Sequence, residues 1–141
     1  MNINDYLTYS ATVTEENNFY IIKINSIEQE TCTEDKDKIE YFAKSLILDY
    51  AESMIFLKRP IKPNKIKSQE NLLINMEYDF ALKCMIRNIM YETTIRPSEL
   101  ASLLNISKQS VNNILNLKKK TNLDTLALCF KVLKRPLTIE A

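Results

Sequence analysis

The 141-residue chain contains no histidine, no glycine and only three cysteines. Because histidine is the commonest general base, its absence excludes a Ser-His-Asp hydrolase. The cysteines, Cys32, Cys84 and Cys129, are far apart and have no paired spacing. We therefore expect neither a disulfide framework nor a cysteine zinc site, and no bound metal or cofactor.

The lack of glycine gives asparagine a particular role, because asparagine is the next best residue where a turn or helix end needs a positive φ. Asn17 and Asn18 lie between two strand-like segments, where a hairpin turn would be. Asn105 separates two short amphipathic segments. We expect these three asparagines to adopt left-handed backbone conformations.

The chain also lacks the features of export and membrane insertion. Residues 1–20 contain no basic start followed by an apolar run, and no apolar segment is long enough to span a bilayer. We expect a cytoplasmic protein with no membrane partner.

Charge is distributed unevenly, although the net charge is only +1. Residues 1–57 carry 4 basic and 11 acidic side chains, whereas residues 79–141 carry 10 basic and 5 acidic ones. This asymmetry suggests nucleic acid as the partner of the basic part and a basic protein as the partner of the acidic part. An acidic surface that is simply solvated is the alternative.

The first part of the chain predicts a small antiparallel sheet and one long helix. Residues 6–13 alternate between apolar and polar side chains, and residues 19–24 are mostly β-branched or aromatic, so these segments predict a hairpin. Residues 29–32 predict a weaker third strand. From Asp35, a suitable N-cap, apolar residues recur every three or four positions, which predicts a helix over 36–57.

A basic connection with two prolines follows over residues 58–70, and the prolines exclude a continuing helix. We interpret this connection as a solvated loop. Residues 72–76 then predict an edge strand or a connector. We place a domain boundary after them, with an α+β domain at 1–76 and an all-α domain at 77–141.

Residues 97–116 predict a helix-turn-helix. Pro97 suits the first helical position because its missing N–H would have no intrahelical partner there. Ser107 can cap the second helix by accepting a backbone N–H. The inner face of the two helices is predicted to consist of five apolar residues, Leu100, Leu104, Ile106, Val111 and Ile114.

Two further helices are expected to pack against this pair. One begins at Asp79, a possible N-cap, and runs to about Tyr91. The other is capped by Asn122 and ended by Pro136. The positions that it is predicted to bury are Leu123, Leu126, Ala127, Phe130 and Leu133.

The second helix of the pair is expected to expose polar side chains with no carboxylate among them. Gln and Asn can bond adenine N6 and N7 bidentately, Ser can bond bases or phosphate, and Lys neutralises phosphate. Three lysines follow where phosphate contacts commonly flank a recognition helix. A plain αα-hairpin and a solvated turn are the alternatives. The predicted DNA-binding residues are Ser107, Lys108, Gln109, Ser110, Asn112, Asn113, Asn116, Lys118, Lys119 and Lys120.

The order of these elements resembles the HicB family of antitoxins over nearly the whole chain. The similar stretches are TYSATVTEENNFYIIKI, DKDKIEYFAKSLILDYAESM, and LLINMEYDFALKCMI leading into IRPSELASLLNISKQSVNNILNLKKKTNLDTLALCFKVLKRPLTI. The last of these also resembles the DNA-binding domains of phage repressors of the Cro and C1 kind.

The resemblance implies an α+β fold, with a partial, degraded RNase H-like N-terminal domain and a C-terminal helix-turn-helix domain. It implies that the first domain binds and covers HicA, a small basic mRNA-cleaving toxin. It also implies that the second domain represses the operon by binding double-stranded operator DNA. Repressors of this class bind paired half-sites as two-fold dimers, so we expect a homodimer or a higher homo-oligomer.

Two other functions stay open. A phage-like transcriptional repressor without a toxin partner would have the same helix-turn-helix. A nuclease of the RNase H type would need clustered carboxylates that hold Mg²⁺, for which Asp5, Glu28 and Asp49 are candidates. Nothing in the sequence brings these three together, so we expect no enzymatic activity.

Overall fold

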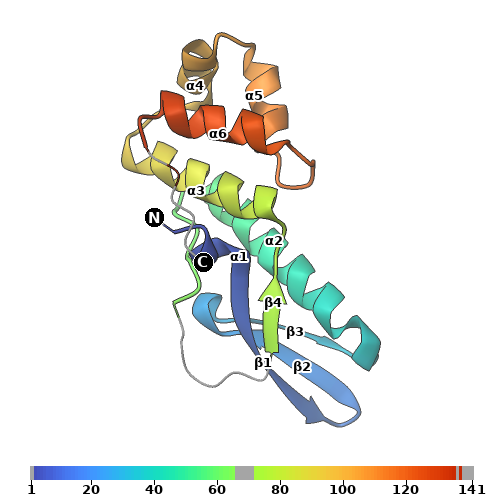
Figure 1. The fold of residues 1–141 in the computed structure, drawn as a ribbon. Helices are drawn as coiled ribbons and strands as arrows, with labels where there is room; N and C mark the ends of the chain where they lie inside the picture. The colour runs from blue at the N-terminus through green and yellow to red at the C-terminus, as the bar shows by residue number, and fades with distance from the viewer. Residues whose placement is uncertain (1, 66–71, 136, 138–141) are drawn as a thin grey trace.

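The computed structural model describes residues 2–65, 72–135 and 137, and it has the expected α+β fold (Figure 1). Residues 66–70 of the basic connection lie outside the described ranges. The elements of the first part are α1 (Asn4–Leu7), β1 (Thr8–Glu16), β2 (Phe19–Ile24), the 3₁₀ turn η1 (Asn25–Ile27), β3 (Gln29–Thr33), the 3₁₀ turn η2 (Lys36–Lys38), α2 (Ile39–Leu57) and β4 (Leu72–Asn75). The second part contains α3 (Tyr78–Glu92), α4 (Pro97–Leu104), α5 (Lys108–Leu115) and α6 (Leu123–Val132).

The four strands form one antiparallel sheet in the order β3-β2-β1-β4, so the edge strand predicted after the connection is present. Asn17 and Asn18 join β1 to β2 with φ values of 51° and 69°, which confirms the left-handed turn. β1 begins later than predicted because Tyr6 and Leu7 belong to α1. Their backbone N–H groups both donate to the carbonyl of Ile3, at 3.0 Å, and close a helical turn there.

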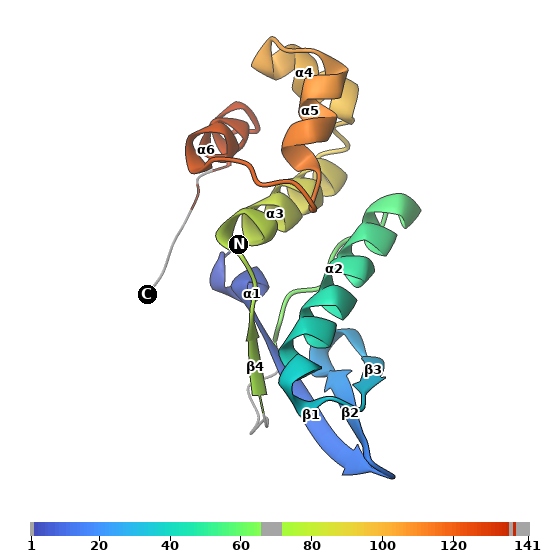
Figure 2. The ribbon, with the colours of Figure 1, turned by 90° about the vertical axis from the view of Figure 1, so that its right-hand side faces the viewer.

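The long helix is also confirmed. The side chain of Asp35 accepts the backbone N–H of Asp37 at 2.9 Å and caps η2, which leads directly into α2. α2 lies along one face of the sheet and contacts β2, β3 and β4 (Figure 2). Its buried residues, Ala43, Ile47, Tyr50 and Ala51, follow the helical spacing that predicted it.

The described part of the basic connection is only partly the solvated loop that we expected, because most of its side chains are exposed but its middle is bound to the fold. Ile61 is buried, and its backbone N–H and carbonyl both bond the side chain of Asn88 at 2.8 Å. The backbone of Lys62 donates to the hydroxyl of Tyr50 and accepts from the hydroxyl of Tyr9, both at 2.9 Å. Side chains from three elements therefore satisfy the backbone of this segment, which holds it against the fold.

α3 is the central element, and ten of its residues are buried. It packs against α1 on one side and against α6 on the other (Figures 1 and 2). Its N-cap is Glu77, not Asp79 as predicted. Asp79 is instead the second residue of α3, and its carboxylate accepts from the side chain of Lys83 and from the backbone N–H of Thr121.

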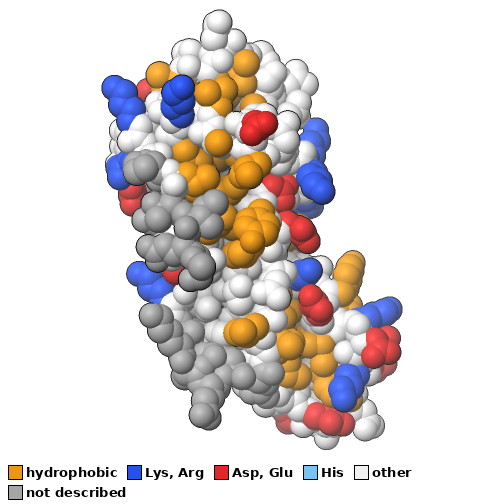
Figure 3. All heavy atoms as spheres, in the orientation of Figure 1, with side chains coloured by type: hydrophobic (Ala, Val, Ile, Leu, Met, Phe, Trp, Pro, Cys, Tyr) orange, Lys and Arg blue, Asp and Glu red, His pale blue; other side chains and the backbone are white. Residues whose placement is uncertain are grey.

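α6 starts as predicted but buries a different set of residues. Asn122 caps it by accepting the N–H of Thr125 at 2.8 Å. Leu126, Phe130 and Leu133 are buried as expected. Leu123, 55% exposed, and Ala127 face solvent, because the buried face of the helix consists of Leu126, Cys129, Phe130 and Leu133. Figure 3, which has the orientation of Figure 1, shows hydrophobic side chains exposed on the face of the molecule that is turned toward the viewer.

Candidate nucleic-acid interface

α4 and α5 form a helix-turn-helix whose turn has the predicted local geometry. Asn105 ends α4 with a left-handed φ of 57°. The backbone N–H of Ile106 reaches back to the carbonyl of Ala101 at 3.0 Å, as in a glycine-type helix end. Ser107 then caps α5, because its hydroxyl accepts the backbone N–H of Ser110 at 3.1 Å.

Four of the five residues predicted for the inner face of this pair are buried or half-buried. Leu100 and Val111 are fully buried, and Leu104 and Ile114 are half-buried. Ile106 is 37% exposed, so its predicted place on the inner face is wrong.

The outer face of α5 is polar and accessible. Lys108, Gln109, Asn112 and Asn113 are all exposed, and they come from two successive turns of the helix. From 107 to 120 the chain contains no acidic residue. α4 and α5 lie at the end of the molecule that is remote from the sheet, so the sheet does not cover this face (Figure 1). We call these four residues the polar face of α5.

Three other predicted DNA-binding residues are engaged in the local structure. The hydroxyls of Ser107 and Ser110 bond each other at 2.8 Å while the cap is in place. Asn116 ends α5, and its side-chain oxygen accepts the N–H of Lys118 at 2.9 Å. Ser110 and Asn116 are only partly exposed, so these residues shape the ends of the helix and are less available than the polar face.

Residues 116–121, which we call the basic loop, present three exposed lysines beside α5. The ammonium of Lys119 donates to the side-chain oxygen of Asn113 at 3.0 Å, which places this cation next to the polar face. The ammonium of Lys118 lies 3.7 Å from the carboxylate of Glu52 on α2. Lys120 is exposed at the end of the cluster. The structure thus brings the predicted lysine group and the polar face together.

Lys83, which sequence reasoning missed, lies beneath the basic loop. Its side chain is completely buried, and its ammonium donates to the backbone carbonyls of Asn116, at 2.9 Å, and of Lys119. It also lies 3.5 Å from the carboxylate of Asp79. Burial lowers the pKa of Lys83, and the Asp79 carboxylate opposes this decrease. The available signal was a lysine within FALKCMI, a stretch that is otherwise apolar on every side of the helix.

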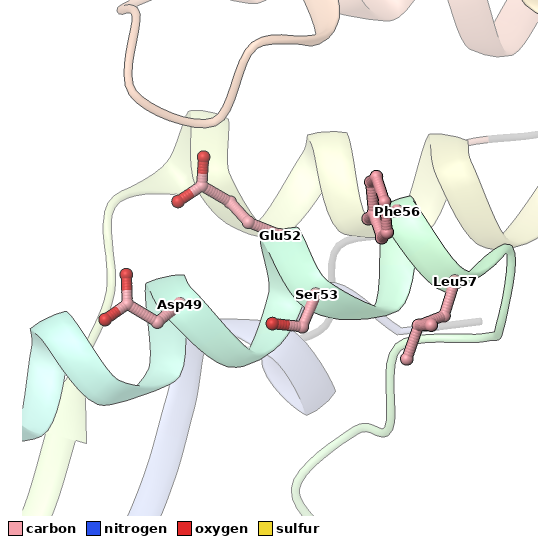
Figure 4. A pocket seen from close by; sticks show the side chains of 5 residues that line it. All are labelled: Asp49, Glu52, Ser53, Phe56 and Leu57. Atoms are coloured by element: carbon pink, nitrogen blue, oxygen red, sulfur yellow. The ribbon is translucent and has the colours of Figure 1, made fainter.

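A second surface feature lies on α2, where Asp49, Glu52, Ser53, Phe56 and Leu57 line a shallow open pocket of about 570 Å³ (Figure 4). Phe56 is 85% exposed, which is unusual for a large aromatic side chain. Figure 4 shows that the two carboxylates and the aromatic ring come from the same helix. The pocket is therefore apolar at one end and acidic at the other.

The carboxylates considered as a possible metal site do not converge within residues 2–65 and 72–135. No three acidic, cysteine or histidine side chains lie close enough there to hold a metal ion, so Asp5, Glu28 and Asp49 do not form a cluster. Cys84 is buried, and burial raises the pKa of its thiol well above the usual value, which makes it a poor nucleophile. Over the same ranges, no helix is both long and apolar enough to cross a membrane.

The sequence matches no protein-family model and none of the curated proteins with which it was compared. The resemblance to HicB antitoxins therefore depends on the quoted stretches and on the order of the elements, and it stays a prediction.

Proposed function

We propose that this protein is a transcriptional regulator that binds double-stranded DNA with α5 as its recognition helix. The observation that carries the proposal is the asymmetry of α5, whose polar face is exposed and free of carboxylates while Val111 and Leu115 anchor the opposite face in the core. The major groove of B-DNA is wide enough for one α-helix. Gln109 and Asn112 are the candidates for bidentate contacts with adenine.

The basic loop provides the accompanying phosphate contacts. Lys119 lies beside Asn113, so a duplex in contact with the polar face would bring its phosphates close to this ammonium. Phosphate contacts fix the register of a protein on DNA, whereas base contacts read the sequence. We therefore assign the reading of bases to the polar face of α5 and the contacts with phosphate to the lysines of the basic loop.

We further propose that the first part of the chain neutralises a HicA-like toxin, so that the protein is an antitoxin that represses its own operon. Two observations support this role. Residues 1–57 have a large acidic excess, which would steer a basic RNA-binding protein toward them. The pocket on α2 combines Asp49 and Glu52 with the exposed ring of Phe56, and aromatic side chains are common anchors at protein interfaces.

Binding to the DNA upstream of its own gene tests the regulator. We expect a dissociation constant at least about a thousandfold lower for this DNA than for a random duplex of equal length at the same salt concentration. Asn112→Asp keeps the size of the side chain but places a carboxylate on the polar face, and it should abolish the preference. Gln29→Glu on β3, a matched change far from α5, should leave it intact. Equal affinity of the unmodified protein for both duplexes contradicts the proposal.

The antitoxin role needs a separate experiment, because a phage-like repressor without a toxin would also pass the first test. The reading frame next to the gene is co-expressed with this chain. A short basic protein that arrests growth alone, and that co-purifies with this chain without arresting growth, supports the antitoxin. Tight DNA binding with no such partner favours the phage-like repressor. Sedimentation of the purified protein tests the expected homodimer or higher homo-oligomer.

A further inference from the structure

Lys83 has a place in the fold that simple core packing does not explain. It is one of two charged or amide side chains buried within α3, and its ammonium is directed at the end of another helix. Burying an ammonium costs free energy unless several acceptors surround it. Here the acceptors are two backbone carbonyls of the basic loop and the carboxylate of Asp79.

These contacts hold the basic loop at both ends. The carbonyl of Asn116, at the C-terminal end of α5, accepts from the ammonium of Lys83 at 2.9 Å and from the backbone N–H of Lys119 at 3.2 Å. The carbonyl of Lys119 accepts from the same ammonium. The N–H of Thr121 donates to Asp79 at 3.3 Å, and the Thr121 hydroxyl donates to the carbonyl of Ile114 at 3.0 Å. Lys119 is thus itself an attachment point, and Lys118 and Lys120 each lie between two of them.

We infer that Lys83 is a positioning residue of the DNA interface, which sets the distance between the polar face of α5 and the lysines that contact phosphate. This inference rests on the proposed DNA binding and deepens it. Lys83 is completely buried and touches no DNA itself. It acts through the backbone of the basic loop, so that the three lysines are arranged before DNA arrives and less conformational entropy is lost on binding.

The experiment compares Lys83→Met with Arg87→Met. Both changes remove one positive charge from α3, and no described hydrogen bond joins Arg87 to the basic loop. Affinity for a random 20-base-pair duplex is measured from 50 to 300 mM KCl. Each lost phosphate contact lowers the slope of log affinity against log salt by about 0.9. We expect Lys83→Met to lower the slope by about two and to weaken binding at least about tenfold, although every exposed lysine is still present. Arg87→Met should leave the slope unchanged.

A double-mutant comparison separates positioning from a general loss of stability. If Lys83 acts through the loop, adding Lys83→Met to a variant with Lys118, Lys119 and Lys120 all changed to Ala should weaken binding by less than about twofold. In the absence of DNA, the amide of Thr121 should exchange with solvent at least about tenfold faster in Lys83→Met than in the unmodified protein, while amides of the sheet keep their rates. If Lys83→Met does not fold, Lys83→Gln is used, because it keeps a polar side chain but removes the ammonium that bonds both loop carbonyls.

The outcomes are distinguishable. Unmodified protein that binds DNA, together with an unchanged slope or an unchanged Thr121 exchange rate in the variant, overturns the role of Lys83 and leaves the proposed function standing. Equal effects of Lys83→Met and Arg87→Met on the slope also overturn it, because they indicate a loss of charge and not of position. Unmodified protein with no affinity for any duplex overturns the proposed function and this inference with it.

Discussion

The ammonium of Lys118 lies 3.7 Å from the carboxylate of Glu52, so the basic loop touches the acidic helix α2. Both side chains are partly exposed, at 64% and 35%, and such pairs stabilise a fold by less than about 1 kcal/mol. The position of the pair is more important than its strength. It places a carboxylate at the edge of the proposed DNA interface, where phosphates would otherwise be the partners of Lys118.

Replacing Glu52 by Gln should therefore strengthen DNA binding. The change removes a negative charge close to the phosphates and frees Lys118, so we expect affinity for a random duplex to rise about two- to threefold at 50 mM salt and the gain to fade at higher salt. Fluorescence anisotropy titrations measure the effect. Glu40→Gln is the matched control, since Glu40 is also on α2 and forms an ion pair with Lys44 at 3.6 Å. Weaker binding of the Glu52 variant would contradict the prediction.

Asn112→Ala should reduce sequence discrimination. Asn112 is exposed on the polar face and is assigned to read a base edge, so its loss should cost about 1 to 3 kcal/mol on the preferred duplex and little on random DNA. Competition titrations with both duplexes give the two values. Equal losses on specific and random DNA would show that Asn112 does not read bases.

Lys119→Ala, unlike Asn112→Ala, should weaken the binding of preferred and random DNA alike. Its ammonium is assigned to phosphate, so binding should weaken by a similar factor on every duplex, and the slope of log affinity against log salt should fall by about one. Lys23→Ala on β2 removes an exposed lysine from the sheet and serves as the control. An effect confined to the preferred duplex would exclude the phosphate role.

Regular amphipathic patterns made most of the fold predictable. The periodicity after Asp35 predicted α2, and Asn105 and Ser107 predicted the turn and cap of the helix-turn-helix because each performs a local task. Local rules also explain the failures. α1 has only four residues, too few for any period to appear. Ile61 is buried by long-range bonds to Asn88, 27 positions away, which no local pattern encodes.

The candidate interface was predictable on its outer side only. Exposed polar residues such as Gln109 and Asn112 follow directly from the burial of Val111. The bonds from Lys83 to the basic loop could not be predicted from the sequence, because the two carbonyls that it bonds are 33 and 36 positions further along the chain. The apolar surroundings of Lys83 in FALKCMI could have indicated a buried lysine, but they do not indicate which carbonyls it bonds.

Asn88→Ala should destabilise the whole protein. Asn88 accepts the N–H of Ile61 and donates both to the carbonyl of Ile61 and to the hydroxyl of Tyr6, all at 2.8 Å. The variant leaves these buried groups without a partner, at a cost of about 1 to 3 kcal/mol for each that water cannot reach. We expect a loss of about 3 kcal/mol in the free energy of unfolding, measured by urea denaturation. Ser102→Ala, on the exposed side of α4, should cost less than about 0.5 kcal/mol.

Stability should fall in mild alkali, for a reason that lies in the core. Burial raises the pKa of the Cys129 thiol to about 11, and burial raises the pKa of the Tyr6 hydroxyl to about 12. The folded state therefore keeps protons that the unfolded chain releases above about pH 9 and pH 10, so the free energy of unfolding decreases as pH rises through this range. Burial lowers the pKa values of Lys83 and Arg87, which acts in the opposite direction but concerns fewer groups than the buried thiols and tyrosines.

Cys129→Ala isolates one part of this decrease. At pH 10.5 the unfolded chain has released the Cys129 proton and the folded chain has mostly kept it, which corresponds to about 2 kcal/mol of stability lost relative to pH 8. The variant loses packing at every pH, but its free energy of unfolding should fall about 2 kcal/mol less than that of the unmodified protein between these two pH values. Cys32 is exposed, so Cys32→Ala should decline in parallel with the unmodified protein. Identical pH profiles for all three proteins, measured by urea denaturation, would show that the thiol of Cys129 is not the group that titrates.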